Sequence, residues 1–200
     1  MKISLVQENP VVGDIEGNAS IARDYILKFD SSGSDLIVFS ELFITGYPPE
    51  DLLLREDFLI SAQKSVENLS SSIKKSKVLI GLPTWKDGKR YNSAALLDKS
   101  GIIQIYDKHV LPNYIEFDEK RYFSNGNSKN FFQLNDLKVG LSICEDIWDE
   151  GFIDLQKENN LDLLINLSAS PFTTSKKEER GNIFTKISEK LNIPLIYVNQ

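Results

Sequence analysis

The amino-acid sequence predicts an α/β protein in which mixed β-sheets carry helices on at least one face. Segments with strand and helix patterns alternate at both ends of the chain, and pairs of strands joined by short turns occupy its middle. Several strand segments are short, continuous apolar runs, such as Leu36-Ile37-Val38-Phe39. Such runs are typical of strands that are covered on both faces.

The first half of the chain is expected to form five strands and two helices. Residues 18–29 place Ile21, Tyr25 and Ile26 at helical spacing, and Ser31-Ser32-Gly33-Ser34 ends that helix. A second helix is expected at residues 56–73, whose apolar side chains again share one face. Strands are expected at residues 3–7, 36–39, 78–83, 92–97 and 102–106, and the turn at 98–101 indicates a hairpin.

The second half is expected to begin with an irregular, polar segment at residues 111–126. Strands are expected at residues 131–134, 137–143, 161–167 and 193–198, and helices at 147–159 and 176–191. The first two of these strands form a second hairpin around Asn135-Asp136. The last strand is as apolar as a central strand, which needs a neighbour on each edge. We therefore expect the domain to be incomplete at Gln200.

Charge and composition exclude several classes of function. The net charge is −6 and the pI is about 4.9, which argues against a nucleic-acid partner because phosphate binding needs a concentrated basic face. A single cysteine rules out an intrachain disulfide, so nothing indicates an oxidising compartment. The chain has no signal-peptide pattern and no apolar run of about 18 residues. We predict a cytoplasmic protein without a membrane partner.

Three chemically active residues occupy equivalent positions, each just beyond an expected strand. Glu41 follows the strand at residues 36–39, Lys108 follows the strand at 102–106, and Cys144 follows the strand at 137–143. In open α/β sheets, ligands bind outside the carboxyl ends of the strands. The sequence therefore predicts that these three side chains converge.

Together the three side chains would form a site that hydrolyses an amide. A thiol attacks only after losing its proton, and a carboxylate such as that of Glu41 can take the proton and pass it to departing ammonia. The ammonium of Lys108 stabilises the oxyanion, and the backbone N–H of Glu145 is a second candidate donor. We predict Cys144 as the nucleophile and a small carboxamide as the substrate.

Each of these residues also has a simpler interpretation. Considered alone, Cys144 is most simply interpreted as a small buried apolar residue. A lone lysine such as Lys108 is most simply interpreted as a surface charge. His109 is adjacent to Lys108, so in an extended segment only one of them faces the thiol, and we expect a structural or surface role for the histidine. No metal is expected, because one Cys and one His do not make a tetrahedral zinc site, and Asp146 and Asp149 suit a turn or a helix start.

The motifs around the three residues resemble those of a known family. Phe39-Ser40-Glu41-Leu42, Tyr106-Asp107-Lys108-His109 and Ile143-Cys144-Glu145-Asp146 look like the Glu–Lys–Cys triad of the nitrilase superfamily of carbon–nitrogen hydrolases. Residues 46–55, which contain Pro48-Pro49-Glu50-Asp51-Leu52, and residues 108–114 with 117–123 are similar to signatures of glutamine-dependent NAD synthetases. Generic nitrilases share the triad but lack the Pro-Pro-Glu-Asp-Leu run.

The resemblance implies a fold and an activity. The fold would be a four-layer α-β-β-α sandwich, with residues 1–200 forming a truncated glutaminase domain and the carboxyl-terminal synthetase domain absent. The domain would hydrolyse L-glutamine through a cysteine thioester and supply ammonia for the ATP-dependent amidation of deamido-NAD. It would need no cofactor of its own, with ATP and Mg²⁺ serving the synthetase domain, and the family implies a homo-oligomer.

The resemblance also assigns substrate-binding roles. Tyr114 would hold glutamine, Ser170 and Lys176 would bind its amino-acid end, and Tyr47, Glu119, Glu145 and Trp148 would line the pocket. The chain departs from the family pattern at Ser175 and at residues 115–116, where smaller residues are expected. Two other readings remain open: a stand-alone nitrilase-type amidase acting on another small carboxamide, and an inactive fragment or binding module.

Overall fold

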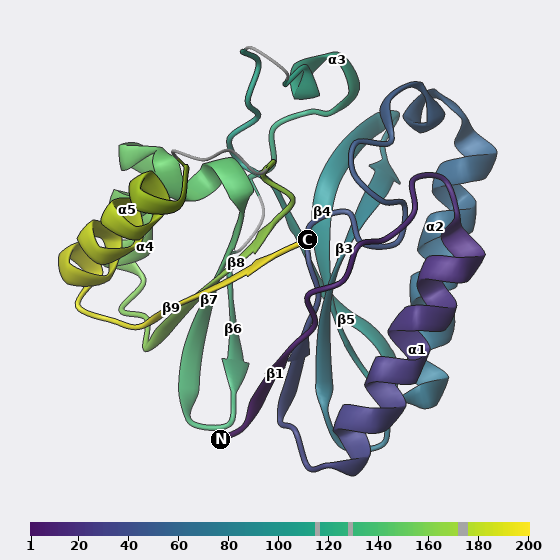
Figure 1. Ribbon diagram of the computed structural model, residues 1–200, viewed down its shortest axis with the longest axis horizontal. Coiled ribbons are helices and arrows are strands. Elements are labelled where there is room, and N and C mark those ends of the chain that lie inside the picture. The colour runs from purple at the N-terminus through teal and green to yellow at the C-terminus, as the bar shows by residue number, and fades with distance from the viewer. Residues whose placement is uncertain (115–116, 128–129, 172–175) are drawn as a thin grey trace.

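A computed structural model of the chain describes all residues except 115–116, 128–129 and 172–175 (Figure 1). For residues 176–179 it describes the backbone but not the side chains. The departures noted at Ser175 and at 115–116 lie outside the described residues. The chain forms two mixed sheets. The first contains β1 (Ile3–Leu5), β2 (Leu36–Val38), β3 (Lys77–Lys86), β4 (Lys89–Asp98) and β5 (Gly101–Asp107), in that order. The second contains β6 (Phe131–Leu134), β7 (Leu137–Ile143), β8 (Leu163–Ser168) and β9 (Leu195–Asn199).

Helices cover the outer face of each sheet, which gives the four layers α-β-β-α (Figure 1). α1 (Ile15–Ser31) and α2 (Glu56–Leu69) lie on the first sheet, and α4 (Glu150–Glu158) and α5 (Lys176–Leu191) lie on the second. The short α3 (Glu119–Tyr122) and the 3₁₀ turns η1 (Glu50–Leu54), η2 (Ser70–Ser72) and η3 (Cys144–Trp148) complete the elements. The predicted sandwich is confirmed.

The alternation of side chains along β2 explains the layering. Leu36 and Val38 belong to the apolar cluster between the two sheets, whereas Ile37 and Phe39 pack with the helices α1 and α2. An apolar run of this kind is buried on both faces, as its sequence predicts. α1 begins at Ile15, earlier than the periodicity indicates, because the side chain of Asp14 caps the helix by accepting a hydrogen bond from Gly17 N.

Besides the short helix α3 inside the segment expected to be irregular and the end of α2 at Leu69 instead of residue 73, two regions differ from the sequence-based expectation. β3 and β4 are longer than expected and form their own hairpin through Asp87 and Gly88, both with positive φ. η1 follows the Pro48-Pro49 turn where only a loop was expected. Neither difference moves the strand ends that carry the candidate site. β2 and β5 end on the same side of the first sheet, because β2 is parallel to β3 and the two antiparallel pairings of β4 return β5 to that direction.

Candidate active site

A buried ion pair joins two of the three predicted residues. Lys108 Nζ lies 2.8 Å from Glu41 Oε1 and 2.9 Å from both carboxylate oxygens of Glu119. The lysine side chain is 0% exposed, so its charge depends on these partners. Burial lowers the pKa of Lys108, but the two carboxylates more than offset this and hold the pKa well above its ordinary value. The lysine is therefore a fixed cation.

Glu41 is held from both sheets. Asn92, on β4, donates a side-chain hydrogen bond of 2.8 Å to Oε1, and the backbone N–H of Ala169, just after β8, donates one of 2.9 Å to Oε2. The next residue, Leu42, has a φ of 47°, which turns the chain sharply after the glutamate. Both carboxylate oxygens thus have defined partners, and the orientation of this carboxylate is fixed.

The backbone around Glu41 requires a glycine on the neighbouring strand. A Cβ atom on Gly81 would lie 2.3 Å from Leu42 N and 2.5 Å from the carbonyl oxygen of Ser40. Real Cβ atoms essentially never approach backbone atoms so closely. Gly81 therefore allows β3 to pack directly against the turn that carries Glu41.

Glu119 lies at the start of α3 and is the second carboxyl group that contacts Lys108, after that of Glu41. Burial raises the pKa of this carboxyl to about 7, while Lys108 opposes the shift and Glu41 adds to it. Tyr47 donates a hydrogen bond of 3.1 Å to Glu119 Oε1. The structure thus brings two of the predicted pocket residues, Tyr47 and Glu119, to the ion pair.

Cys144 opens η3 directly after β7, with a φ of 42° that non-glycine residues rarely adopt. Its side chain is buried, 7% exposed. Burial is the main reason that its pKa lies above the ordinary value; the charge of Glu41 raises it further, while Lys108 and a hydrogen bond with Ser168 lower it. Burial and the neighbouring carboxylate thus favour the protonated form of the thiol.

Four other predicted residues do not contact the ion pair or lie outside the described side chains. Tyr114 donates to both oxygens of Glu145, at 2.9 and 3.0 Å, so these two form a pair, and Tyr114 is 49% exposed. Trp148 lines a separate hollow of about 320 Å³ between η3, α4 and α5, and is not among the residues that contact the ion pair. Lys176 begins α5, but its side chain lies outside the described part of the structure.

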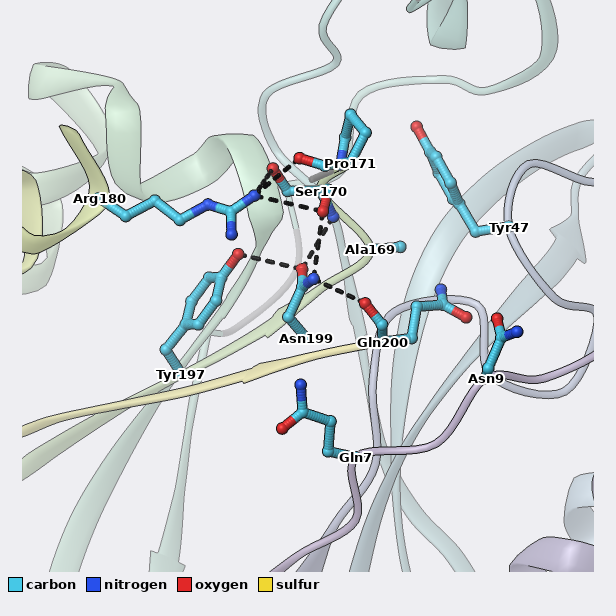
Figure 2. Close-up of a pocket in the computed structure, with 10 residues that line it drawn as sticks. All are labelled: Gln7, Asn9, Tyr47, Ala169, Ser170, Pro171, Arg180, Tyr197, Asn199 and Gln200. Carbon is cyan, nitrogen blue, oxygen red and sulfur yellow. Dashed lines mark hydrogen bonds between the residues drawn. The ribbon is translucent and has the colours of Figure 1, made fainter. Parts of the chain in front are cut away.

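Ser170 is held by residues that sequence reasoning missed. Arg180 Nη2 donates to Ser170 Oγ at 2.9 Å and to the carbonyl oxygen of Pro171 at 2.9 Å. Asn199 accepts from Ser170 N at 2.9 Å and donates to Ser170 O at 3.1 Å. Figure 2 shows these side chains around a cavity of about 430 Å³. No local pattern marks Arg180 or Asn199, because both act across a distance in the sequence.

A second cavity, of about 630 Å³, shares lining residues with the first. Both cavities are lined by Tyr47, Ala169 and Pro171, and the second also by Glu119 and the Pro48-Pro49 turn. Neither is lined by Cys144. Of the buried cluster, Glu119 is the residue that lines the second cavity, and it contacts Lys108.

His109 and Asp149, which the sequence analysis considered as a possible base and a possible metal ligand, have structural roles here. The His109 ring packs against Tyr106 and edge-on against Phe152, both at 5.4 Å between centroids. Asp149 caps α4 by accepting from Phe152 N at 2.8 Å, as predicted for a helix start. Among the described residues, no group of three or more His, Cys, Asp or Glu side chains is arranged to hold a metal ion. In the same described part, no helix is long and apolar enough to cross a membrane.

A Glu–Lys ion pair and a cysteine at strand ends of an α-β-β-α sandwich are the arrangement that the sequence analysis expects of a carbon–nitrogen hydrolase. Residues 2–200 match the model of the family described as carbon-nitrogen hydrolase. The chain belongs to the carbon–nitrogen hydrolase family.

Among curated proteins, the chain is similar to glutamine-dependent NAD(+) synthetases. It is 38% identical to that of Acinetobacter baylyi over 200 residues and 37% identical to that of Thermotoga maritima over 203 residues, covering 100% of this chain each time. The chain spans only 37% and 35% of the length of these two relatives. The resemblance predicted from the triad and the Pro-Pro-Glu-Asp-Leu run is confirmed.

Solved structures agree with these relationships. The glutamine-dependent NAD+ synthetase of Acinetobacter baumannii superimposes with a TM-score of 0.95 at 35% identity, over 99% of this chain and 38% of that one. An amidase from Nesterenkonia sp. superimposes with a TM-score of 0.86 at 19% identity, over 100% of this chain and 75% of that one. The second likeness concerns the fold alone.

Proposed function

We propose that this chain is the glutamine-hydrolysing domain of a glutamine-dependent NAD synthetase. It converts L-glutamine and water into glutamate and ammonia. The observation that carries the proposal is the buried Lys108–Glu41 contact of 2.8 Å beside Cys144. Similarity over the whole of this chain to glutamine-dependent NAD synthetases supports glutamine as the source of the amide.

The first half of the reaction forms a thioester. Glu41 takes the proton of the Cys144 thiol as the sulfur attacks the side-chain carbonyl carbon of glutamine. The resulting oxyanion is stabilised by Lys108 and by the backbone N–H of Glu145. When the intermediate collapses, Glu41 returns the proton to the leaving amine, and ammonia departs. The raised pKa of the thiol fits this scheme, because a protonated nucleophile needs a fixed base.

The second half hydrolyses the thioester. Glu41, again a carboxylate, removes a proton from water while the water attacks the acyl carbon. Collapse expels the Cys144 sulfur, which recovers the proton from Glu41, and glutamate leaves. Glu119 stays in contact with Lys108 throughout, so the ammonium remains directed toward the reacting carbonyl.

Substrate recognition would use the wall beside the cluster. Ser170 Oγ accepts a hydrogen bond from Arg180, and its own proton remains available to the carboxylate of glutamine. Lys176 would add a cation for the same group. The Tyr114–Glu145 pair offers an aromatic surface and a carboxylate acceptor for the substrate ammonium. Tyr47 and Glu119 would complete the lining, whereas Trp148 lines the separate hollow between η3, α4 and α5.

The remaining parts of the proposal concern the protein as a whole. Residues 1–200 would form the glutaminase domain, which needs no cofactor. ATP, Mg²⁺ and deamido-NAD would serve a synthetase domain that receives the ammonia; the similar structure from Acinetobacter baumannii is a complex with adenosine diphosphate. A cytoplasmic location and a homo-oligomeric assembly complete the proposal.

Ammonia release from a panel of carboxamides tests the proposal. We expect release from L-glutamine, loss of release in Cys144→Ala and Glu41→Gln, and no effect of Asp149→Asn, which changes only a helix cap. A glutamine-like electrophile should add to the wild-type protein by intact mass, but not to Cys144→Ala. Ammonia from another small amide but not from glutamine would favour a stand-alone amidase, and activity in Cys144→Ala would refute the nucleophile.

A further inference from the structure

One buried carboxylate, that of Asp146, joins the two backbone segments that carry Lys108 and Cys144. Oδ1 accepts hydrogen bonds from His109 N at 3.0 Å and Val110 N at 2.8 Å. Oδ2 accepts from Ile143 N at 2.8 Å and from the Tyr106 hydroxyl at 2.6 Å. His109 and Val110 directly follow Lys108, and Ile143 directly precedes Cys144.

This connection crosses between the two sheets. Lys108 follows β5 of the first sheet and Cys144 follows β7 of the second, so no strand ladder sets the position of one relative to the other. Asp146 is 0% exposed, and its four hydrogen bonds fill both oxygens of the carboxylate. Charge-assisted hydrogen bonds of this kind are about twice as strong as neutral ones.

The same contact supports the unusual backbone at the cysteine. A non-glycine residue with φ near 42° carries strain of about 1–3 kcal/mol and persists only when its surroundings hold it. The bond from Ile143 N to Asp146 closes the turn around Cys144. Asp146 therefore acts on the nucleophile and on the oxyanion-stabilising cation through the backbone, without contacting either side chain.

We infer that Asp146 is a positioning residue that sets the place of Lys108 relative to the Cys144 sulfur. The inference rests on the proposed amide hydrolysis. An asparagine at this position keeps only one acceptor oxygen, so it serves either the segment after Lys108 or the segment before Cys144. Asp146→Asn thus uncouples the two segments while preserving size and shape.

Steady-state kinetics with glutamine provide the first test. In Asp146→Asn we expect kcat to fall about 10- to 100-fold, because a displacement near 1 Å costs about 100-fold in rate. KM should change by less than about threefold, since the substrate-binding wall is not altered. Asp149→Asn, three residues further on and at an exposed helix cap, should match the wild type in both constants. Wild-type kcat in Asp146→Asn overturns the inference.

A second variant covers a failure to fold. Tyr106→Phe removes one of the four hydrogen bonds and keeps the buried ring, so we expect a native melting transition with a smaller loss of kcat, about 3- to 10-fold. If Asp146→Asn does not fold, this variant decides, and wild-type kcat in Tyr106→Phe then overturns the inference.

Thiol alkylation separates this inference from the proposed function. The pH profile of Cys144 modification by iodoacetamide needs no amide turnover. Because Lys108 favours the thiolate, displacing it should move the profile of Tyr106→Phe, which keeps the Asp146 carboxylate, to higher pH, with Asp149→Asn unchanged. Absence of ammonia release by the wild type would refute the glutaminase, while no shift or a downward shift in alkylation would refute the role of Asp146.

Discussion

The backbone N–H of Ala169 donates a hydrogen bond of 2.9 Å to Glu41 Oε2, although 128 residues separate the two positions. Glu41 follows a strand of the first sheet and Ala169 follows a strand of the second. The proposed base is therefore oriented by the packing of one sheet against the other. The segment that supplies this N–H is itself held by Arg180 and Asn199.

We predict that Arg180→Gln lowers kcat about 3- to 10-fold and raises KM for glutamine. The change removes the donor to Ser170 and Pro171, so both the proposed carboxylate-binding hydroxyl and the Ala169 N–H lose support. Arg55→Gln is the matched control, because Arg55 forms only an exposed pair with Asp57. Kinetics indistinguishable between the two variants would contradict the prediction.

Removal of the buried cation should destabilise the protein as well as inactivate it. Lys108→Met leaves Glu41 and Glu119 adjacent without their cation, and breaking a buried pair in this way costs about 3–5 kcal/mol. Replacing Glu119 by Gln in the same protein should recover part of that loss, because one buried charge disappears, but should not restore ammonia release. Urea unfolding measures the first effect and the glutamine assay the second. A fully stable Lys108→Met protein would show that the pair is not needed for folding.

Glu119 gives the stability of the protein a specific pH dependence. Its pKa is about 7 in the folded protein against an ordinary value of 4.5, mainly because of burial. Between these values the folded state binds more protons than the unfolded state, so the free energy of unfolding falls as the pH rises from about 4.5 to about 7. Glu119→Gln should flatten this slope, whereas Glu67→Gln on the exposed face of α2 should not. Equal slopes in wild type and Glu119→Gln, followed by urea unfolding across this range, would count against the prediction.

Two glycine-to-alanine substitutions should have opposite outcomes. Gly81→Ala places a methyl group against the backbone of Ser40 and Leu42, and we expect a loss of about 2 kcal/mol or more with reduced activity. Gly181→Ala, in α5, meets nothing within 4 Å and should be neutral or stabilising by up to about 1 kcal/mol, because alanine favours the helix. Equal unfolding midpoints for the two variants would be incompatible with the packing described.

The expectations that depended on local pattern agree with the structure. The apolar run at residues 36–39 forms a strand buried on both faces, and the spacing of apolar residues on α2 matches its packing against the first sheet. The β3–β4 hairpin was missed because the ends of the two strands beside the Asp87-Gly88 turn are polar and do not show an apolar strand pattern. Asn92 was missed as a partner of Glu41 because a buried asparagine in a strand has no local signature, and its partner lies 51 residues away.

The sequence by itself determined the alternation of strands and helices, the placement of Glu41, Lys108 and Cys144 at strand ends, and the resemblance to the carbon–nitrogen hydrolases. These features are local, because periodicity, turn residues and motifs each consist of residues that are close to one another in the sequence. Only the tertiary structure decided how the charges are paired, which groups orient Glu41 and how Asp146 links the segments that carry Lys108 and Cys144. Those contacts join the two sheets, and they form only when the burial of both apolar faces brings distant strand ends together.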